Sequence, residues 1–165
     1  MTDEKKQAFV ERHNRMVRYR TWLKWINLVI TGTVYLAYPA FLIRLFIYDR
    51  SALPASIIVP GTGFVLLSAI RYLINAPRPY EVYGVPPVIS KETKGKSFPS
   101  RHVFSIFIIA VTMGVYRPVF GIVIGLLGVI LAAVRVLSGV HFLIDVVVGG
   151  ISAIIYGVLL FGFVF

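Results

Sequence analysis

Five long stretches of this chain carry no Lys, Arg, Asp or Glu, and they limit its fold more than any other feature. They cover residues 25–43, 51–70, 102–116, 118–134 and 146–165. A helix needs about 17–25 largely apolar residues to cross the roughly 30 Å of hydrocarbon in a bilayer. Four stretches have that length, and Arg101 and Arg117 can extend the shorter third one because their long side chains reach the headgroups. The sequence therefore predicts about five membrane-spanning helices.

The composition indicates lipid rather than water as the surrounding of this chain. Hydrophobic residues make up 58% of its 165 residues and charged residues 15%, whereas soluble domains average about 45–50% and about 25%. The absence of cysteine from the sequence excludes disulfide scaffolds, thiolate zinc sites and cysteine nucleophiles. We therefore expect an all-α, polytopic helical bundle in a membrane.

The predicted organisation is a basic segment followed by one membrane-embedded domain. Residues 1–24 carry seven Lys and Arg, and Phe9, Met16 and Leu23 recur every seven residues, which is typical of an amphipathic helix at the membrane interface. A solvated basic tail is the alternative, and His13 is expected to be exposed. The domain covers 25–165, with a polar loop at 75–99 of a length that is usual for functional loops. Its predicted spans are 25–43, 51–71, 100–116, 118–137 and 142–165.

The net charge of +10 comes from 17 Lys and Arg against 7 Asp and Glu. In a soluble protein this balance would suggest nucleic acid, but here the basic residues flank apolar stretches, as anchors to anionic headgroups do. We expect the lipid bilayer, and no nucleic acid, as a partner. With the N-terminus inside, 14 Lys and Arg fall on the cytosolic side and 3 on the other. The sequence therefore predicts that the span ends described next face the cytosol.

Ionisable residues gather where the predicted spans end. Charged groups within or beside a span are costly to place there, so each is by default a functional hypothesis. Two helical hairpins bring them to one face of the membrane. The ionisable residues are Arg71, Arg78, Arg101, His102, Arg135, His141 and Asp145, and the hydroxyl of Ser100 lies among them in the sequence.

These residue types suit a phosphate dianion. Guanidinium groups bind phosphate in a bidentate way, and Ser100 with the first N–H groups of a helix adds an anion site. The sequence has no thiolates, carboxylate cluster or His-Glu-x-x-His pattern, so no metal or cofactor is expected. His141 and Asp145 share a helix face, so the carboxylate can hold one ring nitrogen while the other attacks phosphorus. His102 would protonate the departing oxygen.

The same residues resemble three motifs of the type 2 phosphatidic acid phosphatase family, which is related to the vanadium haloperoxidases. The family motifs are Lys-x6-Arg-Pro, Pro-Ser-Gly-His and Ser-Arg-x5-His-x3-Asp. The corresponding segments here are Arg71-x6-Arg78-Pro79, Pro99-Ser100-Arg101-His102 and Arg135-x5-His141-x3-Asp145. This chain has Arg71 for Lys, Arg101 for Gly and Val134 for Ser. The resemblance covers about half of the chain.

The resemblance implies a phosphohistidine intermediate on His141, oriented by Asp145. It also implies that His102 acts as general acid and then activates water, without a metal ion. Phosphate would be bound by Arg71, Arg78, Ser100 and Arg135, with Arg101 as a further cation. The expected substrate is a lipid phosphate met at the headgroup layer: phosphatidic acid, phosphatidylglycerol phosphate or polyprenyl diphosphate.

Two other classes of function fit parts of the pattern. A catalytically degenerate relative, marked by Arg101, would bind anionic lipid phosphates without hydrolysing them. A small anion transporter would carry ionisable residues near mid-membrane and broken helices, whereas here these residues stand at the span ends. We favour the phosphatase, because unrelated structural roles for all of these residues would have to coincide at one depth.

Overall fold

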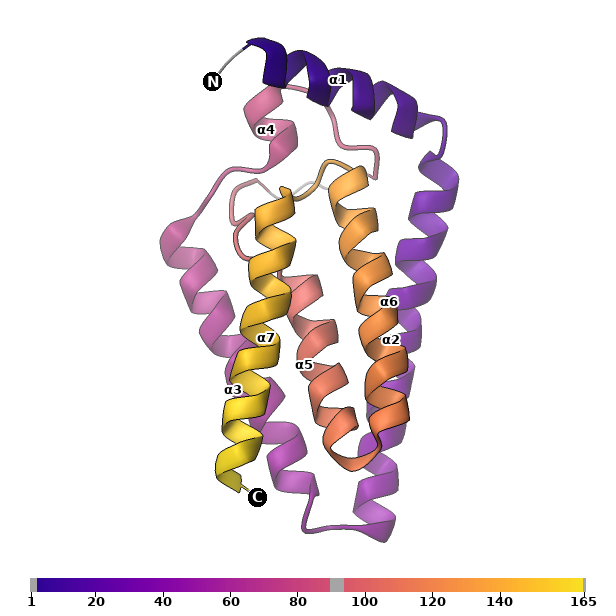
Figure 1. The fold of residues 1–165 in the computed structure, drawn as a ribbon, viewed down its shortest axis with the longest axis vertical. Helices are drawn as coiled ribbons and strands as arrows, with labels where there is room; N and C mark the ends of the chain where they lie inside the picture. Colours follow the sequence, from indigo (N-terminus) through magenta and orange to yellow (C-terminus); the bar gives the residue numbers. More distant parts are fainter. Residues whose placement is uncertain (1–2, 90–93, 165) are drawn as a thin grey trace.

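Helices account for almost all of the regular structure. The computed structural model describes residues 3–89 and 94–164, so part of the predicted loop at 75–99 lies outside the described residues. Over the described ranges the helices are α1 (Asp3–Val17), α2 (Arg20–Tyr48), α3 (Leu53–Ile74), α4 (Pro79–Tyr83), α5 (Arg101–Tyr116), α6 (Pro118–Leu137) and α7 (Leu143–Val164). Figure 1 shows the long helices side by side in one bundle. The predicted all-helical fold is confirmed.

Four of the helices, α2, α3, α6 and α7, are long and apolar enough to cross a membrane. α5 is apolar but has 16 residues, which at about 1.5 Å per residue is less than the roughly 30 Å of a hydrocarbon layer. α2 extends beyond both ends of the predicted span at 25–43, because Lys24 and Arg44 can stay helical while their charges reach the headgroups. The chain is a multi-pass membrane protein.

The short helix α5 forms the centre of the bundle. It packs against α3, α6 and α7, and seven of its 16 residues are buried. One apolar cluster joins α5 to α2 and α6 through Ile106, and a second joins it to α3 and α7 through Phe104. Since other helices surround α5, its length is set by packing within the protein rather than by the thickness of the bilayer.

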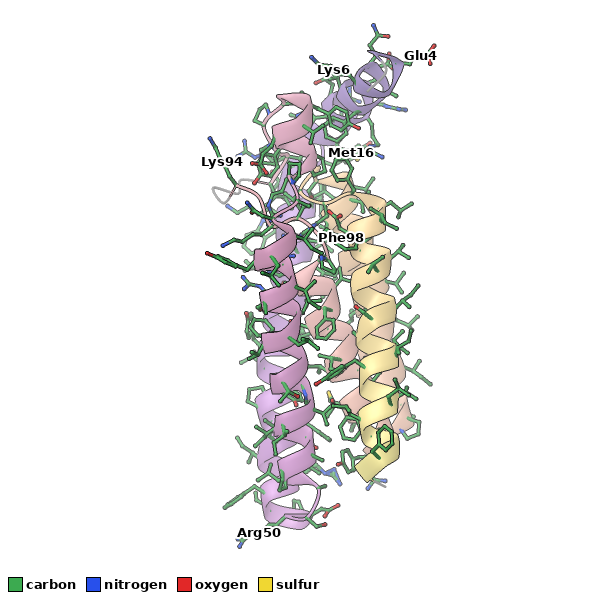
Figure 2. All side chains as sticks on the ribbon, turned by 90° about the vertical axis from the view of Figure 1, so that its left-hand side faces the viewer. Glu4, Lys6, Met16, Arg50, Lys94 and Phe98 are labelled. Carbon is green, nitrogen blue, oxygen red and sulfur yellow. The ribbon has the colours of Figure 1, made fainter. Side chains whose placement is uncertain are left out.

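Apolar side chains cover the outside of the bundle between two charged ends. Leu36, Val65 and Phe163 expose 77%, 67% and 84% of their surface, which is unusual for a protein surrounded by water. Figure 2 places Lys6 and Lys94 at one end of the molecule and Arg50 at the other, with many side chains projecting outward between them. This arrangement fits a protein that crosses a bilayer.

The beginning of α5 lies directly against α7, where Gly149 has no side chain. A Cβ atom at Gly149 would lie 2.8 Å from the carbonyl oxygen of Ser100 and 3.2 Å from its nitrogen. The N–H group of Ser100 donates to the carbonyl oxygen of Asp145 over 2.8 Å. The starts of α5 and α7 are therefore held together through main-chain atoms.

The basic helix α1 lies across the end of the bundle, next to α4 (Figure 1). Phe9 is buried, and its ring stacks on Tyr83 with the centroids 4.3 Å apart. Leu23, further along the same apolar stripe, packs against Val134. The expected exposure of His13 is wrong: it is 8% exposed, because it shares the inward face of α1 with Phe9. The position of α1 at a membrane interface stays a prediction.

Candidate active site

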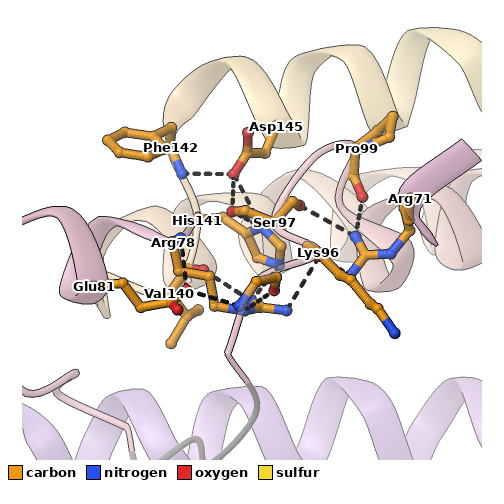
Figure 3. A network of polar contacts seen from close by, with 11 residues as sticks. Arg71, Arg78, Glu81, Lys96, Ser97, Pro99, Val140, His141, Phe142 and Asp145 are labelled. Carbon is orange, nitrogen blue, oxygen red and sulfur yellow. Dashed lines mark hydrogen bonds and ion pairs between the residues drawn. The ribbon is translucent and has the colours of Figure 1, made fainter. Parts of the chain in front are cut away.

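The residues predicted to form a site lie at the end of the bundle that carries α1 and α4 (Figure 1). They come from the C-terminal ends of α3 and α6, the N-terminal ends of α5 and α7, and the loops before α4, α5 and α7. In Figure 3, Lys96 and Ser97 of the loop before α5 lie between Arg71 of α3 and Asp145 of α7. Segments far apart in the sequence therefore meet at one place.

His141 lies in the turn before α7, where Asp145 holds its ring. The distance from His141 Nδ1 to Asp145 Oδ2 is 3.2 Å, and both side chains are almost completely buried. The same carboxylate oxygen accepts the N–H of Phe142 over 3.0 Å. Because an ionised carboxylate only accepts hydrogen bonds, this contact places the imidazole proton on Nδ1 and leaves a lone pair on Nε2. Nε2 lies 3.5 Å from Nη1 of Arg78.

Ser97 was not among the predicted site residues, yet it lies at the centre of the site. It is completely buried, its hydroxyl donates to Asp145 Oδ2, and its Oγ lies 3.3 Å from His141 Nδ1. The signal in the sequence is slight: Ser97 stands in the polar loop three residues before Ser100. Ser97 reaches His141 and Asp145 only in the folded chain, because both lie more than forty positions later in the sequence.

Arg71, at the end of α3, is buried and binds the loop before α5. One of its terminal nitrogens, Nη1, donates to the carbonyl oxygens of Ser97, over 3.1 Å, and Pro99. The other, Nη2, donates to the carbonyl oxygen of Lys96. These contacts orient the guanidinium group through carbonyl dipoles and do not neutralise its positive charge.

Arg78 and Glu81 fix the other side of the same loop. Arg78 donates from Nε to the carbonyl oxygen of Gly95 over 3.0 Å and from Nη1 to that of Val140 over 3.1 Å. Glu81, which was not among the predicted site residues, accepts the N–H groups of Arg78 and Gly95 over 2.8 and 2.9 Å. Gly95 has φ +63°, a conformation that favours glycine. Glu81 therefore ties the start of α4 to the part of the loop that the Arg78 side chain also binds.

Two of the predicted phosphate ligands keep polar atoms without a partner in the described part of the chain. Arg135 is 4% exposed; its Nη1 donates to Asn27 Oδ1 over 3.2 Å, but its Nε and Nη2 have no hydrogen-bond partner there. The hydroxyl of Ser100 is likewise buried and unpaired among the described residues. Buried polar groups are normally paired, so such exceptions need an explanation. Binding of an anion would satisfy both.

His102 and Arg101, in the first turn of α5, line a cavity of about 440 Å³. Apolar side chains of α2 and α5, such as Val34 and Ile106, form much of its wall. Arg101 is exposed, and its guanidinium carbon lies 5.4 Å from the centroid of the Phe64 ring. The structure therefore places these two residues, which directly follow Ser100, at the wall of a largely apolar cavity.

The surroundings of His141 keep its ring neutral. Burial lowers the pKa of His141 from 6.5 to about 4. The hydrogen bond with Asp145 acts in the opposite direction, and the charges of Arg135 and Arg78 add to the lowering. At neutral pH the ring is uncharged, which is the protonation state that a nitrogen nucleophile requires.

This lowered pKa predicts a loss of stability in acid. Between pH 6.5 and about 4 the unfolded chain protonates His141 while the folded chain does not, so the free energy of unfolding falls as the pH falls through this window. The contribution is on the order of 3 kcal/mol, at about 1.4 kcal/mol per pH unit. Thermal unfolding in detergent at pH 7 and pH 4.5 should show a larger decrease in Tm for the wild type than for His141→Gln. Equal decreases would contradict the assignment.

The site as a whole is suited to bind and attack a phosphate group. It combines a neutral imidazole nitrogen with buried guanidinium groups, a buried hydroxyl and the N-terminus of α5. Within residues 3–89 and 94–164, no group of three or more His, Asp or Glu side chains is placed to hold a metal ion.

Comparison with known proteins supports the fold. The sequence model of the PAP2 superfamily matches residues 51–165. The fold is similar to that of LpxE from Aquifex aeolicus, with a TM-score of 0.71 and 24% identity over 87% of this chain and 86% of that one. It is also similar to the first transmembrane PAP2 type phosphatidylglycerolphosphate phosphatase from Bacillus subtilis, with a TM-score of 0.61 and 24% identity over 94% and 86% of the two chains. No curated protein sequence matches significantly.

Proposed function

Since the chain belongs to the PAP2 superfamily, we propose that this membrane phosphatase hydrolyses a lipid phosphate through a phosphohistidine intermediate and without a metal ion. The proposed substrates are phosphatidic acid, phosphatidylglycerol phosphate and a polyprenyl diphosphate. The similar structure from Bacillus subtilis is itself described as a phosphatidylglycerolphosphate phosphatase, which supports the second of them. The substrates share a phosphate group at the headgroup layer, where the helix ends would meet it.

The observation that carries this proposal is the orientation of His141. Its Nδ1 is engaged by Asp145 at 3.2 Å, and its Nε2 points to the guanidinium of Arg78 at 3.5 Å. A phosphate group bound by Arg78 would therefore lie next to the free nitrogen. The unpaired donors of Arg135 and Ser100 would supply further contacts to its oxygens.

In the first proposed step, His141 Nε2 attacks phosphorus and a P–N bond forms as the bond from phosphorus to the lipid oxygen breaks. His102 would donate a proton to the departing oxygen, which leaves as the lipid alcohol or lipid monophosphate. Asp145 would stabilise the positive charge that develops on the imidazole. The arginines would bind the charge on the phosphoryl oxygens, which is the main catalytic contribution in phosphoryl transfer.

In the second proposed step, water replaces His141. His102, now neutral, would accept a proton from water as the water oxygen attacks phosphorus, and the P–N bond breaks. The products are inorganic phosphate and the imidazole with its lone pair restored on Nε2. The cavity that His102 and Arg101 line would accept the part of the lipid next to the phosphate. From the Lys and Arg count, we expect these steps at the cytosolic face.

Phosphate release in detergent tests the proposal. Purified wild type, His141→Ala and His13→Ala are each given the three candidate lipids in the presence of EDTA. We expect release by the wild type with at least one lipid, and a loss of more than about 10³-fold in His141→Ala because the nucleophile is absent. His13→Ala removes a buried histidine outside the site and is expected to retain most of the activity.

Each other outcome would count against one part of the proposal. Equal release by wild type and His141→Ala would exclude the phosphohistidine. Loss of wild-type release on addition of EDTA would exclude a metal-independent reaction. If the wild type released no phosphate from any of the lipids, the catalytic proposal would fail, and binding of lipid phosphate without hydrolysis would become the better account.

A further inference from the structure

Ser97 connects the proposed nucleophile with the loop before α5. Its hydroxyl donates to Asp145 Oδ2 and its Oγ lies 3.3 Å from His141 Nδ1, as Figure 3 shows. No part of the residue is exposed to solvent. Its hydroxyl therefore acts within a closed hydrogen-bonded group of three side chains from two separate segments, the loop before α5 and the start of α7.

The main chain of Ser97 is held on both sides independently of the side chain. Its N–H donates to the carbonyl oxygen of Ala76 over 2.9 Å, and its carbonyl oxygen accepts Nη1 of Arg71 over 3.1 Å. The hydroxyl is thus presented to Asp145 from a fixed backbone. Contacts to Arg71 use the carbonyl group, so they do not depend on the identity of the side chain.

We propose that Ser97 is a positioning residue for phosphoryl transfer, which fixes the Asp145 carboxylate so that His141 presents Nε2 to the phosphate. The proposal rests on the function proposed above. Asp145 Oδ2 accepts three hydrogen bonds, from Ser97, His141 and the N–H of Phe142. The bond to His141 sets the ring, and the other two define where the carboxylate oxygen lies. Without the serine hydroxyl, only the N–H of Phe142 would hold the carboxylate oxygen in its place beside the ring.

This role predicts that Ser97 affects the chemical step and not substrate binding. The phosphate-binding groups Arg71, Arg78 and Arg135 do not contact the serine hydroxyl, and Arg71 keeps its carbonyl partner in Ser97→Ala. A packing defect at this buried position would instead disturb both the nucleophile and the phosphate-binding groups. The ratio of the effects on kcat and KM therefore separates positioning from a general structural role.

The test compares Ser97→Ala with Ser138→Ala by steady-state phosphate release and thermal unfolding in detergent. Ser138 is also completely buried near the site, but its hydroxyl donates only within α6 and its cap, to the carbonyl oxygen of Val134. For Ser97→Ala we expect kcat to fall about 10- to 100-fold, as for loss of one hydrogen bond to a charged group, with KM within about two-fold of wild type. For Ser138→Ala both constants are expected to stay within about two-fold.

The other outcomes would overturn the inference. An unchanged kcat in Ser97→Ala would show that the hydroxyl is not needed, and a KM increase as large as the kcat decrease would indicate a structural defect. Failure of the proposed function itself is recognised separately. In that case the wild type releases no phosphate or His141→Ala remains active, whatever Ser97→Ala does.

Discussion

Replacing Asp145 by asparagine is expected to lower kcat about 10³- to 10⁴-fold while KM for the lipid phosphate changes only a few-fold. The carbonyl oxygen of asparagine can take the place of Oδ2 and accept the same three hydrogen bonds, so the orientation of His141 is expected to persist. The neutral amide would not stabilise the positive charge that develops on His141, which is the reason for the expected loss. Substrate binding depends on the arginines and should persist. Steady-state phosphate release in detergent measures both constants.

Asp49→Asn provides the matched control for this experiment. Asp49 is exposed and follows α2, at the opposite end of the bundle, where it accepts a hydrogen bond from Ser51. Its substitution should leave kcat within about two-fold of wild type. A decrease of less than 10-fold in Asp145→Asn would show that the negative charge of Asp145 is not needed, and the proposed mechanism would need another group to stabilise the imidazolium.

The second large effect is expected from Gly149→Ala, although Gly149 carries no side chain that could bind substrate. The new Cβ atom would lie 2.8 Å from the Ser100 carbonyl oxygen, and a backbone atom at the start of a helix cannot rotate away as a side chain can. The start of α5 must shift, and with it Ser100 and His102. We expect phosphate release to fall at least about 100-fold, because displacements near 1 Å can have effects of this size. Overpacking of this kind typically costs about 1–3 kcal/mol of stability, so Tm should also fall.

The neighbouring glycine gives a close control for that variant. A Cβ atom at Gly150 would lie 3.4 Å from ring atoms of Phe107, an ordinary contact distance with a side chain. Gly150→Ala should therefore keep phosphate release within about two-fold of wild type and change Tm little. If the two alanine variants behaved alike, the close approach of α5 to α7 would not be what aligns the site.

Local sequence patterns were sufficient to predict much of the fold and part of the candidate site. Uncharged stretches marked the long helices because the bilayer requires apolar surface over a fixed length. The pairing of His141 with Asp145 was predicted from their spacing of four residues, and the contact forms although His141 lies in the turn before α7 rather than on the helix. Arg71 and Arg78 were recognisable as basic residues at span ends, and the structure places them around the loop before α5.

The remaining parts depend on contacts that no short pattern encodes. Ser97 meets Asp145 across 48 positions, and Glu81 meets the N–H of Gly95 across 14. A serine or glutamate in a polar loop is common, so these residues had no distinguishing signal before the fold was known. The seven-residue stripe containing Phe9 predicted an apolar face for a helix lying on the membrane, and it gave no sign of a partner within the protein. In the structure Tyr83 of α4 covers Phe9, which is also why the exposure expected for His13 was wrong.

The hydrogen bonds that Arg71 and Arg78 donate to oxygen atoms end on main-chain carbonyl groups. Carbonyl dipoles hold a guanidinium in a fixed direction, but unlike a carboxylate they do not cancel its charge. The fold therefore gives up some stability by burying two like charges next to each other, a common trade between stability and activity. A bound phosphate dianion would add counter-charge to that of Asp145 and Glu81. Ligand binding and resistance to unfolding are thus linked through the same two side chains, and the protein should be most stable when an oxyanion is bound.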